Sequence, residues 1–381
     1  MQSQKFKMKT LEDFNFKGKV VLLRSDLNSD VQKGRLLKSE RIKESAITIN
    51  ELKRKKARVV ILAHQGRPGD EEFTSLRQHC RQLNKYTKAR FVEDIIGKKA
   101  ERAIKDLKNG EAILLENVRY LKEEFDVGRN RLTDFFSGLC EIYVNDAFSV
   151  CHRKQASILF PKYIKKSCAG RILEREVKAL KRLKIKNAIY ILGGAKPKDN
   201  IKLLWKNKVL SCGLFGQVCL INKGKKLGEQ ENYLRRKKVF AKIPKNKLKK
   251  VETPLDFAVD INNSRKEILL SGFPNKYEIF DIGKETQSKY IKEIKKAKAI
   301  YMKGPAGDCS KKRFSRGTFS ILRAISKRKV FSVIGGGHLS DAIEASGISK
   351  KKFGHISLSG GALLNYIAGE KLPGLEVLGI K

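Results

Sequence analysis

The sequence lacks any long apolar run. No stretch of the 381 residues approaches the roughly 18 apolar residues that a membrane-spanning helix needs, and the opening MQSQKFKMKTLEDF lacks the charged and then apolar pattern of a secretory signal. Both absences argue against membrane and secreted classes, so we expect a cytoplasmic protein. With 41% hydrophobic residues the chain is long enough to bury more than one core, and two domains are expected.

Cysteine is sparse and shows no pattern. The seven cysteines are odd in number and never fall as CxxC. This arrangement argues against a disulfide framework and against a cysteine-type zinc site. We therefore expect most of the cysteines to be buried, reduced packing residues.

Acidic residues are too few to balance the basic ones. The chain has 40 Asp and Glu against 83 Lys and Arg, which gives a formal net charge of +43. Such a field favours anionic ligands and attracts nucleic acid non-specifically at low salt. The positive charge is densest at residues 222–252, but no interleaved ladder of aromatic residues accompanies it there. A solvated lysine-rich face is the favoured interpretation, and a basic nucleic-acid-binding protein stays open as an alternative.

One pattern recurs along the chain: four to six apolar residues, a polar or glycine-rich loop, and then an amphipathic stretch. It predicts an α/β fold with parallel sheets covered by helices on both faces, in two Rossmann-like domains. In such folds ligands bind beyond the carboxyl ends of the strands. The segments are KVVLLRSDLN (19–28), RVVILAHQGRP (58–68), AILLENVRY (112–120), EIYVNDAFS (141–149), AIYILGGAKPKDN (188–200), KVLSCGLFG (208–216), AIYMKGPAG (299–307), VFSVIGGG (330–337) and GHISLSGGA (354–362).

The loops of the first half carry charged side chains. Forked guanidinium groups at successive strand ends suit a small, multiply charged anion. Each of these residues could instead be an ordinary surface or packing residue, but their shared position at strand ends favours binding. The candidates are Asp26, Asn28, Arg41, His64, Arg67, Arg119 and Arg153.

The loops of the second half carry glycines and one lysine, which suits a polyphosphate held by backbone amides. The turn at Gly335–Gly337 illustrates the point: we expect a helix to begin near Ser340 and to aim its amides at an anion. Glycines in such a turn are equally common without a ligand, so the turn alone decides nothing. Between the two sets, residues 170–184 have helical apolar spacing and predict a connecting helix, with the two binding surfaces on either side of a hinge.

In order and spacing, these loops resemble those of phosphoglycerate kinase over nearly the whole chain. GGGHL and CGLFG look more like the archaeal branch of that family than the others. The motifs that carry the resemblance are RSDLN, SERIKES, AHQGRP, LLENVRY, YVNDAFSVCHR, ILGGAK, DIGKET, KGPAG, IGGGHLSDAIE and HISLSGGALLNYIAGEKLPG.

The resemblance implies a monomer of two domains that interconverts 1,3-bisphosphoglycerate plus ADP and 3-phosphoglycerate plus ATP, with Mg²⁺ carried mainly by the nucleotide phosphates. It implies a phosphoglycerate-binding domain at 1–169, rejoined by 365–381, then the helix at 170–184 and a nucleotide-binding domain at 185–364. Hinge closure would exclude water. Arg41 and Lys196 would stabilise the transferring phosphoryl group. The seven first-half candidates would hold the glycerate, and the nucleotide-binding residues would be Gly194, Ala195, Lys196, Gly213, Pro305, Gly335, Gly336, Gly337 and His338.

Some nucleotide-side positions depart from the family pattern. Asn200 stands where the family has a second lysine, Lys303 where it has an asparagine, and Ser310 where it has a ribose-binding glutamate. Ser359 and His338 replace a glycine and an aspartate, so no protein metal ligand is assigned, although Asp308 or Asp341 could order water around Mg²⁺. The departures leave a second hypothesis open: a relative that binds phosphoglycerate but uses nucleotide poorly.

Overall fold

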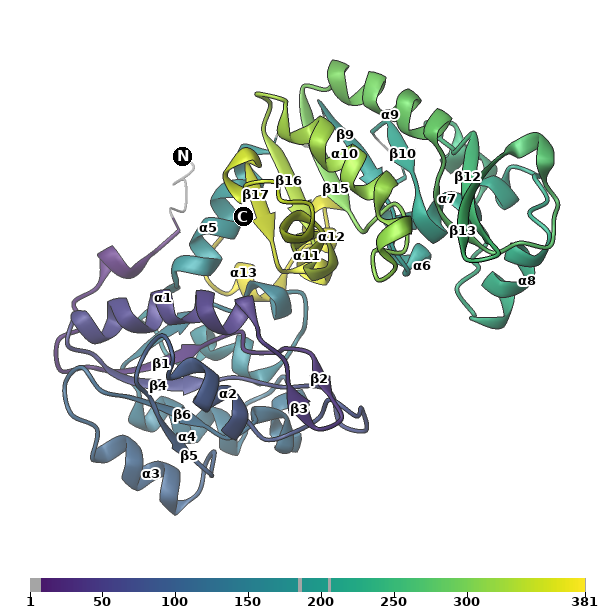
Figure 1. Cartoon of the computed structure of the whole chain (residues 1–381). Coiled ribbons are helices and arrows are strands. Elements are labelled where there is room, and N and C mark those ends of the chain that lie inside the picture. The colour runs from purple at the N-terminus through teal and green to yellow at the C-terminus, as the bar shows by residue number, and fades with distance from the viewer. Residues whose placement is uncertain (1–7, 184–186, 205–206, 381) are drawn as a thin grey trace. The chain divides into compact units, whose positions relative to one another are not determined.

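The computed structural model describes residues 8–183, 187–204 and 207–380. Contacts divide the chain into two compact units (Figure 1): residues 1–177 with 371–381 form unit 1, and residues 178–370 form unit 2. The functional domain boundaries expected from the sequence, at 169, 184 and 365, stay a prediction.

Unit 1 is built on a six-stranded parallel sheet with the strand order β5-β6-β4-β1-β7-β8. The central strand β1 lies between β4 and β7, and Val21 pairs with Val59 on one side and with Ile142 on the other. The strands are β1 (Val20–Arg24), β4 (Arg58–Leu62), β5 (Arg90–Val92), β6 (Ala112–Leu115), β7 (Ile142–Asn145) and β8 (Ser167–Ala169); a small hairpin pairs β2 (Val31–Gln32) with β3 (Arg35–Leu36).

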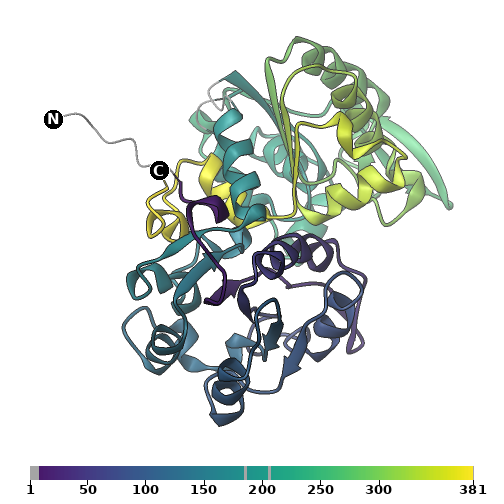
Figure 2. The same cartoon turned by 90° about the vertical axis from the view of Figure 1, so that its left-hand side faces the viewer.

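Helices cover both faces of this sheet (Figure 2). Val21 and Leu23 of β1 pack in one core with the first two helices, whereas Val20 and Leu22 pack in a second core with the next two. Burial on both faces explains why the strand reads as a continuous apolar run. The helices are α1 (Glu40–Arg54), α2 (Arg77–Leu83), α3 (Lys98–Lys105), α4 (Arg131–Leu139) and α5 (Arg171–Arg182), which runs from unit 1 into the start of unit 2.

The end of the chain belongs to unit 1 as well. The short helix α13 (Pro373–Glu376) is anchored by the amide of Gly374, which donates to the carbonyl oxygen of Cys151 at 2.9 Å. A Cβ at Gly374 would lie 2.7 Å from Cγ2 of Ile158 and 2.8 Å from the sulfur of Cys151. Glycine therefore lets this segment pack directly on unit 1.

Unit 2 repeats the plan with a second six-stranded parallel sheet, in the order β11-β10-β9-β15-β16-β17. Apolar residues of α9, α10 and α11 cover one of its faces. The strands are β9 (Ala188–Leu192), β10 (Val209–Ser211), β11 (Val251–Glu252), β15 (Ala299–Lys303), β16 (Ser332–Gly335) and β17 (His355–Ser357). The helices are α6 (Pro197–Asn200), α7 (Gly213–Asn222), α8 (Glu229–Arg236), α9 (Lys284–Lys296), α10 (Arg316–Ser326), α11 (Gly337–Ala345) and α12 (Gly360–Ile367).

A further antiparallel sheet in unit 2 was not anticipated from the sequence. Its central strand β12 (Asp256–Ile261) pairs with β13 (Ser264–Leu269) and with β14 (Ile279–Ile282). Asn262 and Asn263 join β12 to β13 with φ of +51° and +58°. Two asparagines between strands are typical of a tight hairpin turn, so the signal was present in the sequence.

The two parallel sheets with helices confirm the predicted fold class, and each of the nine apolar segments contains a strand of one of them. Six of the seven cysteines are buried and Cys309 is partly buried, as expected for packing residues. In the residues that the structure describes, no helix combines the length and apolar character of a membrane span.

Candidate active site

The charged candidates of the first half meet at one edge of the unit 1 sheet. His64 follows β4, Asp26 follows β1, and Arg153 follows β7. Because these strands are parallel neighbours, their carboxyl ends lie together. Arg119 lies in a short 3-10 turn after β6, and Arg41 projects from the first turn of α1. The structure therefore gathers these residues into one cluster, which we call the basic cluster.

His64 is a neutral hydrogen-bond donor in this cluster. Its Nδ1 lies 3.0 Å from Nη2 of Arg24. A guanidinium can only donate, so Nδ1 accepts and the proton of the neutral ring is on Nε2. Burial holds the pKa of His64 well below its usual value, and the positive charges of Arg24 and Arg119 lower it further. The ring can then donate from Nε2 without adding a charge.

Arg24 is a member of the cluster that the sequence analysis did not single out. It is fully buried, and its Nη1 donates to the carbonyl oxygen of Ser25 at 2.7 Å. Its Nε donates to Oγ of Ser157 at 2.8 Å, and that hydroxyl donates to the buried carboxylate of Glu124 at 2.7 Å. Burial raises the pKa of Glu124, while Arg24 opposes the shift. The sequence signal that could have identified Arg24 is its position: it is a charged residue directly after the apolar run VVLL.

Arg119 has unused donors. Its side chain is buried, and its Nη1 donates to the carbonyl oxygen of Gly66. Its Nε and Nη2 have no partner in the described residues. Burial lowers the pKa of Arg119 to about 9, and the charges of Arg153 and Arg24 contribute to the shift. Because it is buried, has two unpartnered nitrogens and is crowded by like charge, this guanidinium has the chemistry that suits an anion.

Asp26 and Asn28 line the same edge. Nη1 of Arg41 donates to Oδ2 of Asp26, while Oδ1 of Asp26 is buried and has no partner in the described residues. Oδ1 of Asn28 accepts from the amide of Gly66 at 2.8 Å, which orients the Asn28 side chain. The pair therefore offers an unused carboxylate oxygen beside the cations, suited to a ligand hydroxyl.

A surface pocket of about 620 Å³ lies at this cluster. Arg67, which is exposed, lines it together with Arg119 and Arg153. Burial lowers the pKa of Arg153, with Arg67 the largest electrostatic contributor. Two lining residues escaped the sequence analysis: Phe125, and Gln155, whose buried Oε1 has no partner in the described residues. Three cations around a hollow of this size fit a phosphorylated small molecule.

A buried histidine braces the loop that carries His64 and Arg67. Nε2 of His79 lies 2.8 Å from Oε1 of Gln65, and Oε1 also accepts from the amide of Ser29 at 2.9 Å. Nε2 of Gln65 donates to the carbonyl oxygen of Ser29 at 2.8 Å. Because that amide orientation makes Oε1 an acceptor, His79 is the donor. The bond ties α2 to the strand-end loop.

Acidification should weaken folding through His79, because burial lowers its pKa to about 4. An imidazole with a lowered pKa stabilises the folded state fully above its unfolded pKa and loses that contribution as the pH falls from about 6.5 towards 4. Between pH 7 and pH 5 we expect a loss of about 2 kcal/mol in the free energy of unfolding. Urea titrations of wild type and His79→Gln at both pH values measure it. The amide still donates but does not titrate, so an identical pH dependence in the two proteins would contradict the prediction.

In unit 2, three glycine-containing loops lie in contact. The amide of Gly193 donates to the carbonyl oxygen of Lys303 at 2.8 Å, and that of Gly194 donates to Pro305 at 2.9 Å. A Cβ on Gly213 would lie 2.8 Å from both the amide nitrogen of Gly194 and the carbonyl oxygen of Pro305. Gly213 also has φ of +53°, so glycine is needed there on both counts. The loops after β9, β10 and β15 thus form one surface.

Lys196 and Ala195 lie on the exposed side of this surface. Lys196 is the residue before the single-turn helix α6, and its side chain is exposed. Lysine at the end of a glycine turn can reach a phosphate as a mobile point charge.

The glycine turn after β16 opens a helix, but earlier than expected. Helix α11 begins at Gly337, not near Ser340, because Gly336 adopts φ of +108° and turns the chain directly into the helix. Gly336 supplies no side-chain cap, and its carbonyl oxygen accepts from the amide of Leu339 at 3.2 Å, so the amides of Gly337 and His338 are the candidate donors to an anion. Gly335 is the last residue of β16, and His338 is exposed on the first turn.

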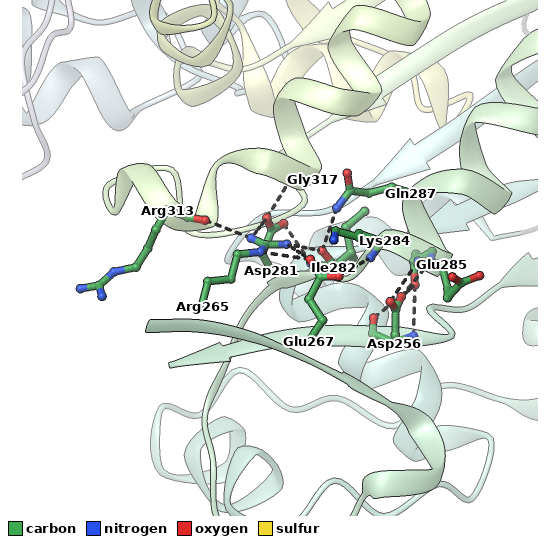
Figure 3. Close-up of polar contacts among 11 residues, drawn as sticks. Asp256, Arg265, Glu267, Asp281, Ile282, Lys284, Glu285, Gln287, Arg313 and Gly317 are labelled. Carbon is green, nitrogen blue, oxygen red and sulfur yellow. Dashed lines mark hydrogen bonds and ion pairs between the residues drawn. The ribbon is translucent and has the colours of Figure 1, made fainter. Parts of the chain in front are cut away.

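A buried ionic network positions the loop after β15 (Figure 3). Asp281 accepts from Nη1 of Arg265 at 2.7 Å and from the amide of Gly317, at the start of α10, at 2.8 Å. Burial raises the pKa of Asp281 to about 6, opposed by Arg265. A Cβ on Gly307 would collide with this carboxylate, so loop and network pack directly. Asp256 caps α9 in the same region through the amides of Glu285 and Thr286.

The structure does not offer a preformed metal cage. Oδ1 of Asp308 accepts from the amide of Ser310 at 3.1 Å and from its hydroxyl at 2.6 Å, which closes a local turn. In the part of the chain that the structure describes, no group of three or more His, Cys, Asp or Glu side chains is placed to hold a metal ion. A magnesium ion here would have to rely on phosphate oxygens and water.

Comparison with known proteins agrees with this geometry. A family model described as phosphoglycerate kinase matches residues 11–370. The chain is 39% identical over 402 residues to the phosphoglycerate kinase of Methanothermus fervidus, covering 98% of this chain and 97% of that one. It is 38% identical over 399 residues to that of Pyrococcus horikoshii, covering 97% of both.

Solved structures give the same result. The crystal structure of phosphoglycerate kinase from Pyrococcus horikoshii OT3 matches with a TM-score of 0.89 at 36% identity, covering 98% of both chains. That of phosphoglycerate kinase from Coxiella burnetii matches with a TM-score of 0.78 at 30% identity, covering 98% of this chain and 99% of the other. The relatives from Methanothermus and Pyrococcus are archaeal, as the sequence motifs indicated, and the chain belongs to the phosphoglycerate kinase family.

Proposed function

We propose that the protein transfers a phosphoryl group reversibly between 1,3-bisphosphoglycerate and ADP, giving 3-phosphoglycerate and ATP. Besides family membership, one observation carries the proposal: Arg119, a buried guanidinium with two donor nitrogens unpartnered among the described residues, lines a pocket with two more arginines. Such donors are costly to bury unless an anion completes them. A phosphorylated glycerate has the charge to do so.

On the glycerate side, the arginines would bind the phosphate of the substrate and hold it in the pocket. Asp26 would accept from the glycerate hydroxyl through its unused oxygen, and Nε2–H of His64 would donate to the substrate without changing the charge of the site. Arg24 would act as a positioning residue, because each of its three nitrogens already bonds Ser25, Ser157 or His64.

On the nucleotide side, Lys196 and the first amides of α11 would bind the phosphate chain. Mg²⁺, carried by those phosphates, would neutralise part of their charge. Phosphoryl transfer spreads negative charge over the equatorial oxygens, so positioned cations matter more than a strong base. We assign that stabilisation to Arg41 and Lys196. The other residues of the nucleotide loops would bind and orient the nucleotide. Exclusion of water would protect the acyl phosphate from hydrolysis.

A coupled assay of ATP formation from 1,3-bisphosphoglycerate and ADP tests the proposal. Turnover that saturates in both substrates is the expected result. Binding of 3-phosphoglycerate without turnover would overturn it in favour of a relative with impaired nucleotide use.

Three remaining expectations stay predictions: a monomer, a cytoplasmic location, and nucleic-acid binding that is at most non-specific. The last follows from the diffuse charge of +43, because purely electrostatic binding disappears as salt rises.

A further inference from the structure

Lys303 ends β15 between two of the glycine-rich turns of unit 2. The sheet register pairs it with Leu192 of β9 on one side and with Gly335 of β16 on the other. The turn that leads to Lys196 starts directly after Leu192, and the turn into α11 starts at Gly335. The side chain of Lys303 is only 14% exposed. A lysine therefore lies, largely buried, at the point where both proposed phosphate-binding turns begin.

The ammonium of Lys303 is held by a neutral partner. Its Nζ donates to Oδ1 of Asn200 at 2.9 Å. Asn200 is fully buried, and its Nδ2 donates to the carbonyl oxygen of Gly193 at 3.0 Å. Because only the amide NH₂ can donate to a carbonyl, this second bond fixes the orientation of Asn200 and turns its oxygen towards Lys303. Asn200 therefore fixes the ammonium of Lys303 beside the turn after β9.

The ion pair that Lys303 makes is weak. Its Nζ lies 3.8 Å from Oδ2 of Asp199, which is long for an ion pair, and the Asp199 side chain is half exposed. Burial lowers the pKa of Lys303, Asp199 raises it, and the neighbouring Lys196 lowers it again. A largely buried ammonium that has a second lysine nearby and only this long ion pair would be stabilised by a further anion at closer range. A phosphate group at the turns would supply that anion.

We propose that Lys303 binds a phosphate group of the nucleotide, with Asn200 as its positioning residue, so that Lys196 and Lys303 together form the cation pair of this site. The inference rests on the proposed function, and it changes how two sequence departures are understood. In the sequence alone, Asn200 and Lys303 are two separate departures, each of which is expected to weaken nucleotide binding. Their side chains are hydrogen-bonded to each other, so the cation is supplied by the strand instead of by the loop.

Lys303→Met in the full-length protein tests the inference, because methionine keeps much of the side-chain length and removes the charge. A charge-assisted hydrogen bond of this kind is worth about 1.5–3 kcal/mol, so the Kd for ADP, measured by calorimetry, should rise by about 10- to 150-fold. The Kd for tripolyphosphate should rise by a similar factor, and the Kd for 3-phosphoglycerate should stay unchanged. The matched control is Lys298→Met, an exposed lysine directly before the other end of the same strand, which should leave all three values unchanged.

A second variant distinguishes loss of the lysine charge from loss of folding. The exchange Asn200→Lys with Lys303→Asn rebuilds the contact in the reverse direction and should recover most of the affinity that Lys303→Met loses. Unchanged ADP affinity in Lys303→Met would overturn the inference. So would a parallel loss of affinity for ADP and 3-phosphoglycerate, since that indicates a structural role only. Failure of the wild-type protein itself to bind ADP would instead refute the proposed function.

Discussion

Arg41→Ala lowers kcat by about 10²- to 10³-fold, in the directions of ATP formation and of ATP use alike. Both directions share one transition state, in which negative charge is spread over the transferring phosphoryl group. Arg41 reaches the basic cluster from the first turn of α1, and its carboxylate partner Asp26 orients it. Lys196→Ala should lower kcat by a comparable factor, because its exposed ammonium is the proposed counterpart on the nucleotide side.

Matched controls separate this effect from a change in total charge. Arg102→Ala removes an 86% exposed arginine of α3, and Lys249→Ala removes an exposed lysine of unit 2. Both controls should keep wild-type kcat in coupled assays run in each direction. If Arg41→Ala and Lys196→Ala also keep it, the assignment of charge stabilisation to these two residues is wrong.

Arg24→Ala destabilises unit 1 by about 3–5 kcal/mol, as is typical when one member of a buried charged pair is removed. Arg24 is fully buried, and its charge is compensated by the buried carboxylate of Glu124, to which it is linked through the hydroxyl of Ser157. Alanine removes the cation that bonds Nδ1 of His64 and that most strongly opposes the raised pKa of Glu124, and it opens a cavity of arginine size. The midpoint of urea unfolding, followed by far-ultraviolet circular dichroism, measures the loss. Hydrogen exchange in unit 1 peptides localises it.

The double variant Arg24→Met with Glu124→Leu distinguishes charge from packing. Because removing both charges leaves no isolated ion, the double variant should be more stable than Arg24→Met alone. Arg90→Ala, at an exposed position of β5, is the control and should change the free energy of unfolding by less than about 0.5 kcal/mol. If Arg24→Ala lowers the free energy of unfolding by no more than Arg90→Ala does, the hydrogen-bonded network of Arg24, Ser157 and Glu124 does not stabilise unit 1.

The sheets were predictable because their strands are buried on both faces. VVLL of β1 and AIYIL of β9 are apolar at every position, and such runs have few alternatives to a central parallel strand. The antiparallel sheet was missed because β13 (SRKEIL) is largely exposed and shows no apolar run. Only its two-asparagine turn signalled a hairpin.

The candidate site was predictable in part, for a related reason. His64, Arg67, Arg119 and Arg153 could be proposed because parallel strands bring their carboxyl ends together, whatever the details of packing. The start of α11 was placed too late, since Gly336 looked like loop and its positive φ in fact makes it the turn into the helix. Gln155 was missed, because nothing in a single glutamine shows that it is buried and lines a pocket.

The sequence by itself determined where the strands lie and which kind of residue follows them. Apolar runs mark the strands, and the loops after them carry cations in the first half of the chain and glycines in the second. Those features are local, and local pattern is enough to specify them. The tertiary structure alone decided which charged groups are left without partners. Arg24 spends its donors on Ser157, 133 positions away, and Lys303 meets Asn200 across 103 positions. Hydrogen bonds between such distant residues depend on how strands pack, and packing is not encoded in any short stretch of the chain.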